Sequence, residues 1–334
     1  MSAKTLPYAG LLFILAALCA GLFLVSLAIG YAPLDLAGAA ADALGGRETL
    51  GALVLVELRL PRAVLGLLVG FTLGLAGAVM QGFLRNPLAE PGVVGVSGGA
   101  ALGAVLVFYS GLAALSPVLL PLGGILAALV VGGLLFAVAG RGMSTTTLIL
   151  AGVAINSLAG ALIALTLNLA PNPYAAMEIM FWLMGSLPDR SFAHVWIALG
   201  PMLVGWAMLL ATGRALDALS LGEDTARTLG FGLGRVRATL VAGVALCVGA
   251  ATAVAGVVGF VGLVVPHLIR PFVAHRPGRL LIASGLGGAS LTLAADIAVR
   301  LIPTRPELQL GVVTAIVGAP FLFSLVWRYR RYER

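Results

Sequence analysis

The chain has 334 residues, of which 60% are hydrophobic and only 10% are charged, and its net charge is +7. Soluble domains carry about 25% charged residues, so this chain cannot form a water-exposed surface and most of its outside must face lipid. Its basic residues fit the loops of a membrane protein, and no basic stripe with interleaved aromatic residues indicates a nucleic-acid partner.

Apolar runs of about 20 residues, the length that crosses a bilayer as a helix, recur along the whole chain. We expect spans near residues 8–30, 62–82, 93–109, 118–139, 147–168, 192–212, 237–257, 280–300 and 308–327. A shorter run, 258–270, predicts a half-length or tilted helix. The pattern therefore predicts an all-α integral membrane protein with about ten transmembrane helices. No linker rich in Ser or Pro divides it, so residues 1–334 are expected to form a single transmembrane domain.

The first span and the basic residues predict the orientation in the membrane. Tyr8–Gly30 is longer than the apolar part of a signal peptide, which has about 7–15 residues, so we interpret it as a retained span. When ten crossings are threaded from a cytoplasmic N-terminus, 14 of the 20 basic residues fall on the inner side. Because cytoplasmic loops retain Arg and Lys, this bias predicts that both termini are cytoplasmic.

Glycines repeat every four residues on one face of the second and third expected spans. The two strips are Gly66, Gly70 and Gly74, and Gly95, Gly99 and Gly103. Small residues at this spacing let two helix backbones approach closely. The strips predict either tight packing within one subunit or the lining of a pore or subunit interface.

Two polar segments meet the inner side. The 85–92 loop joins the second and third spans, and its prolines, Pro87 and Pro91, forbid a continuous helix there. The run Ser144–Thr147 opens the fifth span near the same membrane face. Either segment could narrow an inner gate, although Ser or Thr at a helix start is also an ordinary N-cap.

Residues 215–234 predict a short amphipathic helix on the inner side. Ser220 and Glu223 have the spacing of a capping box, and Gly230 suits a C-cap, which gives a helix of about nine residues. Its apolar side would be formed by Leu221, Ala226 and Leu229. Such a helix could dock in a partner's groove or lie flat on the lipid interface. Glu223 and Asp224 favour docking, because interfacial helices usually carry a basic polar face.

Basic residues also mark the outer side. Arg59 and Arg62 stand at the mouth of the second span, and Asp296 and Arg300 have the i, i+4 spacing of a local ion pair. The alternative to a local pair is a basic rim that receives acidic residues of a partner.

Other candidate sites are weaker. Met177, Met180 and Met184 share a helical face and could contact a ligand, but we expect them to fill a core. The histidines, His194, His267 and His275, lack metal-site spacing, so no metal site is expected. Cys19 and Cys247 lie in apolar runs and are interpreted as small buried side chains.

No catalytic set is recognisable, and the single lysine, Lys4, follows Ala3. A phosphate-binding Walker loop requires a lysine after glycine and is therefore impossible in this sequence. A membrane conduit whose energy comes from a separate chain is the function that these observations favour.

Six stretches, taken together, resemble the FecCD, or vitamin-B12-permease-like, family of ABC importer permeases for iron-siderophore, haem and cobalamin. They are RLPR at Arg59–Arg62, QGFLRNPLAEPGVVG at Gln81–Gly95, FWLMGSL at Phe181–Leu187, LGEDTARTLG at Leu221–Gly230, GFVGLVVPHLIR at Gly259–Arg270 and GVVTAIVGAPF at Gly311–Phe321. One departure is Gln309, where the family usually has proline.

The resemblance implies a type II ABC importer permease in a bacterial inner membrane. Two copies would form a homodimer with the pathway between them, two ATP-binding subunits would sit inside, and a periplasmic or lipid-anchored solute-binding protein would dock outside. ATP and Mg would belong to the partner ATPase, so this chain would be neither an enzyme nor a cofactor carrier. The cargo would be an iron chelate (siderophore or haem) or cobalamin, with an iron chelate favoured by the breadth of the family.

The resemblance also implies roles for individual residues. Coupling to the ATPase would fall to Leu219, Ser220, Leu221, Gly222, Glu223, Asp224, Ala226, Arg227, Leu229 and Gly230. The cytoplasmic gate would consist of Asn86, Pro87, Leu88, Ser144, Thr145, Thr146 and Thr147. Docking of the binding protein would use Arg59, Arg62 and Arg300.

An ion-gradient-driven secondary transporter is the alternative function. Such a protein needs ionisable or ion-coordinating groups near the middle of the membrane. Here the acidic residues cluster in loops and at span ends, which favours the ABC permease.

Overall fold

The computed structural model describes residues 7–30, 33–116, 118–139, 145–302, 304 and 306–332, and within these ranges the only regular elements are helices. Ten helices form the bundle in the described part of the chain: α1 (Tyr8–Ala28), α4 (Leu60–Phe83), α5 (Val96–Tyr109), α6 (Leu119–Ala139), α7 (Thr145–Asn168), α9 (Phe192–Ala211), α12 (Leu233–Ala255), α13 (Val261–Ile269), α14 (Pro277–Leu301) and α15 (Leu310–Tyr332). Six helical stretches are long and apolar enough to cross a membrane, and four shorter apolar helices accompany them. The all-α membrane architecture predicted from the sequence is confirmed.

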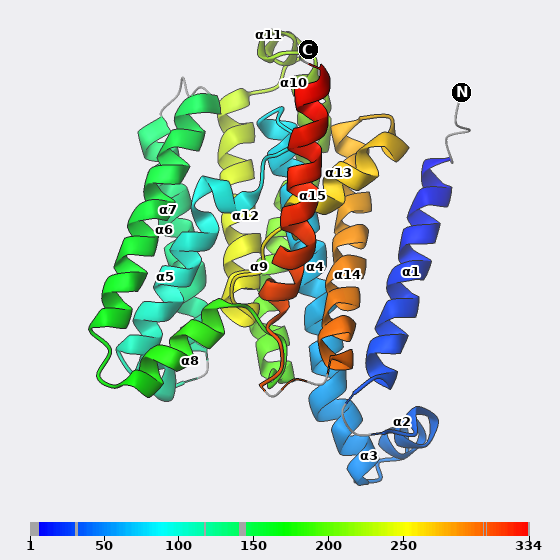
Figure 1. Ribbon diagram of the computed structural model, residues 1–334. Helices are drawn as coiled ribbons and strands as arrows, with labels where there is room; N and C mark the ends of the chain where they lie inside the picture. The colour runs from blue at the N-terminus through cyan, green and yellow to red at the C-terminus, as the bar shows by residue number, and fades with distance from the viewer. Residues whose placement is uncertain are drawn as a thin grey trace.

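Short helices lie at both ends of the bundle (Figure 1). The α8 end carries α2 (Leu36–Leu44), α3 (Leu50–Leu53), η1 (Val54–Arg59) and α8 (Pro173–Leu183), and the α11 end carries α10 (Gly213–Ser220) and α11 (Glu223–Thr228). Three further short turns are η2 (Pro91–Val94), η3 (Leu112–Ala114) and η4 (Arg270–Val273). Helix α1 begins and α15 ends at the α11 end, so both chain ends lie on the same side of the bundle.

The second span begins earlier than predicted. The sequence indicated 62–82, whereas α3, η1 and α4 form one helical stretch, Leu50–Phe83, that projects beyond the other helices at the α8 end (Figure 1). Thr49 caps its start, because the side chain accepts a hydrogen bond from Ala52 N at 3.3 Å. Pro61 has no N–H and cannot donate to a carbonyl of the preceding turn. That preceding turn is the π-helical turn η1, which accommodates the missing hydrogen bond, so the helix continues through Pro61.

Helices α4 and α14 pack closely at the centre of the bundle. A methyl group on Gly74 would overlap the carbonyl oxygen of Ser284, and one on Gly70 would overlap that of Gly288. In the second strip, Gly103 of α5 faces Gly123 of α6 in the same way, and Gly95, just before α5, packs against Gly152 of α7. Both glycine strips therefore serve packing within the chain, which is one of the two predicted roles.

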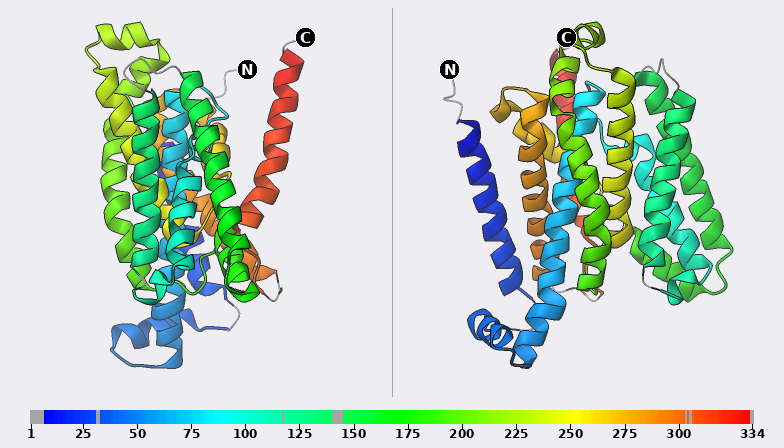
Figure 2. Two further views of the ribbon diagram at one scale, coloured as in Figure 1. Left: turned by 90° about the vertical axis from the view of Figure 1, so that its left-hand side faces the viewer. Right: turned by 180° about the vertical axis from the view of Figure 1, so that it is seen from behind.

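Helix α13 is half a span long, as predicted. The chain leaves α12 at Ala255, runs without helix through residues 256–260, and begins α13 at Val261. Phe260, the residue before α13, has a φ of +67°, which is uncommon for a residue with a Cβ. Figure 2 shows α15 leaning away from the bundle towards its C-terminal end.

Candidate functional site: the α11 end, the 85–92 loop and the α8 end

The segment predicted to be one coupling helix is two short helices. Ser220 ends α10, and its hydroxyl donates to the carbonyl of Asp217 at 2.6 Å. Gly222 has a φ of 115°, a conformation that favours glycine, and α11 begins after it with six residues. The predicted capping box of Ser220 and Glu223 is therefore wrong, because the turn at Gly222 separates the two residues.

Charged residues hold α11 in place. Arg227 pairs with Glu223 at 3.1 Å and with Asp224 at 2.7 Å, and Glu223 also pairs with Arg237 of α12 at 2.9 Å. The carboxylate of Asp224 is 97% exposed, whereas Arg237 is 10% exposed. Glu223 therefore fixes α11 to the bundle, and Asp224 is available to a partner.

The apolar side of α11 is only partly open. Ala226 is fully buried and packs into the core, so it is not available to a partner. Leu221 and Leu229 are 69% and 60% exposed. Of the residues predicted to form the docking face, these two leucines and Asp224 are therefore the ones that a partner could reach.

The 85–92 loop is an ordered turn at the α11 end. The side-chain oxygen of Asn86 accepts a hydrogen bond from Leu88 N at 2.9 Å, and its carbonyl accepts one from Ala89 N at 3.1 Å. Asn commonly makes this turn before proline, here Pro87. The side chain of Glu90 contacts a segment outside the loop, where it accepts a hydrogen bond from Phe260 N at 2.7 Å. Sequence reasoning missed this contact, because an acid between two prolines resembles an exposed loop residue.

The second predicted gate segment is partly described. Ser144 lies outside the described residues, α7 begins at Thr145, and Thr146 and Thr147 are exposed on its first turn. Helix α7 packs against η2, which begins at Pro91 within the 85–92 loop. The two segments therefore belong to one corner of the bundle, and their role as a gate stays a prediction.

The three arginines predicted to form an outward rim are turned into the protein. Arg59 and Arg300 are 6% and 7% exposed. Arg59 donates to the carbonyls of Leu27 and Ala28 at 2.9 and 2.7 Å. Arg300 donates to the carbonyls of Ser26 and Ile29, both at 2.7 Å. These carbonyls belong to the end of α1 and would otherwise lack partners. The prediction of an exposed rim is thus corrected, because Arg59 and Arg300 form a buried cap of α1. The role of these arginines in docking stays a prediction.

Two acids balance the arginines at the α8 end. Asp296 pairs with Arg300 at 2.8 Å, which confirms the local pair that the i, i+4 spacing predicted. It also pairs with Arg62 at 2.8 Å, and Arg62 forms a further ion pair with Glu307 ahead of α15. The last two contacts join segments far apart in the sequence, and no local pattern could indicate them.

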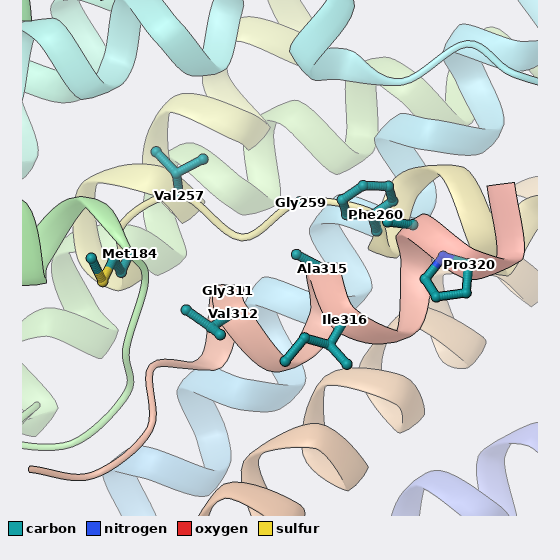
Figure 3. A pocket seen from close by; sticks show the side chains of 10 residues that line it. Met184, Val257, Gly259, Phe260, Gly311, Val312, Ala315, Ile316 and Pro320 are labelled. Carbon is teal, nitrogen blue, oxygen red and sulfur yellow. The ribbon is translucent and has the colours of Figure 1, made fainter. Parts of the chain in front are cut away.

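An apolar groove runs along α15 with a volume of about 750 Å³ (Figure 3). It is lined by Met184, Val257, Gly259, Phe260, Gly311, Val312, Ala315, Ile316, Ala319 and Pro320. Helix α15 begins at its edge, where the carbonyl of Gln309 accepts hydrogen bonds from Val312 N and Val313 N at 3.1 and 3.3 Å. The groove has almost no polar lining and could hold an apolar surface, such as a second subunit, better than a charged ligand.

The methionine face does not fill a core. Met177, Met180 and Met184 are 51%, 47% and 40% exposed on or next to α8. This prediction is wrong because α8 lies at the periphery of the bundle (Figure 1), where the described residues leave that face exposed.

Comparison with known proteins identifies the family. Residues 17–328 match the FecCD transport family. The chain is similar to the vitamin B12 import system permease protein BtuC of Vibrio cholerae (43% identical, covering 81% of this chain and 82% of the relative). It is also similar to the cobalamin import system permease protein BtuC of Halobacterium salinarum (39%, covering 90% and 80%).

Two further relatives have less specific descriptions. The chain is 37% identical to an uncharacterized ABC transporter permease protein, YvrB, of Bacillus subtilis, over 87% of this chain and 83% of the relative. A solved structure described as a candidate metal-chelate type ABC transporter in an inward-facing conformation superimposes with a TM-score of 0.83 at 31% identity, over 96% of this chain and 99% of the other. The chain therefore belongs to the FecCD transport family of ABC importer permeases.

Proposed function

We propose that this chain is the membrane subunit of a binding-protein-dependent importer that moves a metal chelate by alternating access, driven by ATP hydrolysis in a separate subunit. The match over residues 17–328 carries the proposal. The absence of a Walker lysine from the sequence supports an external ATPase. Cobalamin, itself a cobalt chelate, is the first candidate cargo, because relatives from two organisms bear that name; iron-siderophore and haem are the second.

The proposed ATPase contact lies on α10 and α11. The carboxylate of Asp224 is exposed, and so are two leucines on either side of it in the sequence, Leu221 and Leu229. The ion pair of Glu223 with Arg237 attaches α11 to α12, so a force on α11 would reach the bundle. Two ATP-binding subunits would press on this helix, one on each copy of the chain. The α11 end, and with it both chain ends, would then lie in the cytoplasm of a bacterial inner membrane, and the distribution of the basic residues supports this orientation.

The proposed homodimer uses the open side of α15. Ile316, Val317 and Phe323 are exposed, and the apolar groove lies beside them. A second copy would cover this surface, and the pathway would run between the two copies. The 85–92 loop and the start of α7 would close the pathway at the α11 end.

The solute-binding protein would dock at the α8 end. Arg62 already pairs with Asp296 and Glu307, so docking through this arginine requires that a carboxylate of the partner exchange with one of them. This differs from docking on a free basic rim.

Uptake into proteoliposomes tests the function. The chain would be reconstituted with its ATPase and binding protein and supplied with labelled cyanocobalamin, an iron-loaded hydroxamate siderophore or haem. We expect uptake that requires ATP and survives an ionophore that collapses ion gradients. Uptake that needs the gradient and not the ATPase would support the secondary-transporter alternative instead.

A further inference from the structure

The first turn of α13 is held by the 85–92 loop through two contacts. The carboxylate of Glu90 accepts the hydrogen bond from Phe260 N at 2.7 Å, which satisfies a donor at the start of a helix. Next to it, Pro91 packs against Gly262, where an added Cβ would lie 3.2 Å from the proline ring. A shift of the loop therefore displaces the start of α13.

The same turn of α13 contacts α15. A methyl group on Gly318 of α15 would overlap the Phe260 side chain, so the ring lies directly against the helix backbone. Further along α13, His267 packs edge-on to Phe321 of α15, with 5.6 Å between ring centroids. Phe260 thus contacts the loop through its backbone N–H and contacts α15 through its ring. Figure 3 shows the ring beside α15 at the groove.

Helix α4 anchors α13 on its other side. The fully buried amide of Gln81 donates to the carbonyl of Leu263 at 3.1 Å and accepts a hydrogen bond from Arg270 at 2.6 Å. Gln81 thereby fixes α13 to α4 near both of its ends, and the first turn of α13 also lies between the loop and α15. The first turn can therefore move only together with the segments packed on it, so a displacement of the loop would be shared by α15.

We propose that Glu90 is a positioning residue that links the 85–92 loop to α15 through the first turn of α13, so that the loop and α15 move together. This inference rests on the proposed function, because it assumes that the loop is part of a gate. The link depends on the side-chain oxygen that accepts the hydrogen bond from Phe260 N, and it does not need the negative charge of Glu90.

The test compares three variants of the complete complex. E90A removes the acceptor, E90Q keeps an acceptor oxygen at the same reach, and G133A is the control, because an added Cβ at this position of α6 meets nothing within 4 Å. The quantity measured is substrate moved per ATP hydrolysed. We expect E90A to lower this ratio about tenfold while ATP hydrolysis continues. E90Q and G133A should stay close to the wild type.

A second measurement distinguishes a lost link between the loop and α15 from unfolding of the protein. Leu88→Cys and Ile316→Cys place reporters on the loop and on α15, and the native Cys19 and Cys247 are buried and should not react. In the wild type, the labelling rates of both reporters should change together when nucleotide is added. In E90A, one should change without the other.

The outcomes are distinct. Joint changes in E90A, an unchanged transport ratio in E90A, or a loss in E90Q as large as in E90A would each overturn the inference. If E90A does not fold, E90D replaces it in the test. Asp keeps the charge, but its oxygen lies one methylene further from Phe260 N, so E90D should lower the amount of substrate moved per ATP hydrolysed. A wild-type complex that hydrolyses ATP without moving any substrate would refute the proposed function instead, and the reporters would still show whether loop and helix move together.

Discussion

Arg62 of α4 and Asp296 of α14 form an ion pair of 2.8 Å, although 234 residues separate them in the chain. The side chain of Asp296 is 2% exposed, and the same carboxylate also pairs with Arg300. One buried acid therefore joins two arginines where α1, α4 and α14 meet.

Asp296→Asn should destabilise the protein more than any exposed pair does. Removing one partner of a buried ion pair leaves uncompensated charge, which typically costs about 3 kcal/mol or more of unfolding free energy. The measurement is thermal or denaturant unfolding in detergent. Asp42→Asn is the control, because Asp42 pairs with the 69% exposed Arg47, and such pairs contribute about 0.5 kcal/mol. Equal losses in the two variants would show that the buried pair has no special importance.

Asp224→Arg should uncouple transport from ATP hydrolysis without unfolding the chain. The carboxylate is exposed, so the change places a positive charge on the surface proposed to meet the ATPase. We expect uptake to fall about tenfold or more, with normal expression and melting temperature. Normal coupled uptake in Asp224→Arg would remove α11 from the ATPase contact.

Gly74→Ala should destabilise the bundle by about 1–3 kcal/mol, because the new methyl group would overlap the Ser284 carbonyl and force α4 away from α14. The control is Gly133→Ala on α6, where an added Cβ meets nothing within 4 Å. Melting temperatures in detergent distinguish the two. A fall of equal size in both variants would contradict the close approach of α4 and α14.

Glu90 should make stability depend on pH. Burial raises the pKa of its carboxyl above the ordinary 4.5, although the hydrogen bond from Phe260 N acts to lower it. The folded state then binds the proton on Glu90 more tightly than the unfolded state, so the contribution of Glu90 to stability is greatest below pH 4.5 and is lost as the pH rises through the folded pKa. The wild type should therefore lose stability relative to E90Q, which does not titrate here. Unfolding of both proteins from pH 4.5 upwards measures this, and a constant difference would show that the pKa is not raised.

The sequence predicted the spans because bilayer thickness fixes the length of an apolar helix, and even the half-length α13 was recognisable. The start of the second span was missed, because Pro61 resembles a helix start and a π-helical turn accommodates it inside the helix. The division of α10 from α11 was missed because it depends on one backbone angle, that of Gly222.

The sites were less predictable than the spans. Spacing along one helix indicated the pair of Asp296 and Arg300. Contacts between distant segments, such as Glu90 with Phe260 or Arg62 with Glu307, depend on how helices pack and leave no local pattern. Burial also reversed two expectations, since Arg59 proved buried and Met177 exposed.

The most direct measurement is ATP hydrolysis and substrate uptake by the purified chain in proteoliposomes, with and without its ATPase subunit. The account predicts neither activity for the chain alone, and ATP-driven uptake once the ATPase and the binding protein are added. Hydrolysis of ATP by the chain alone, or accumulation of substrate without the ATPase, would contradict it.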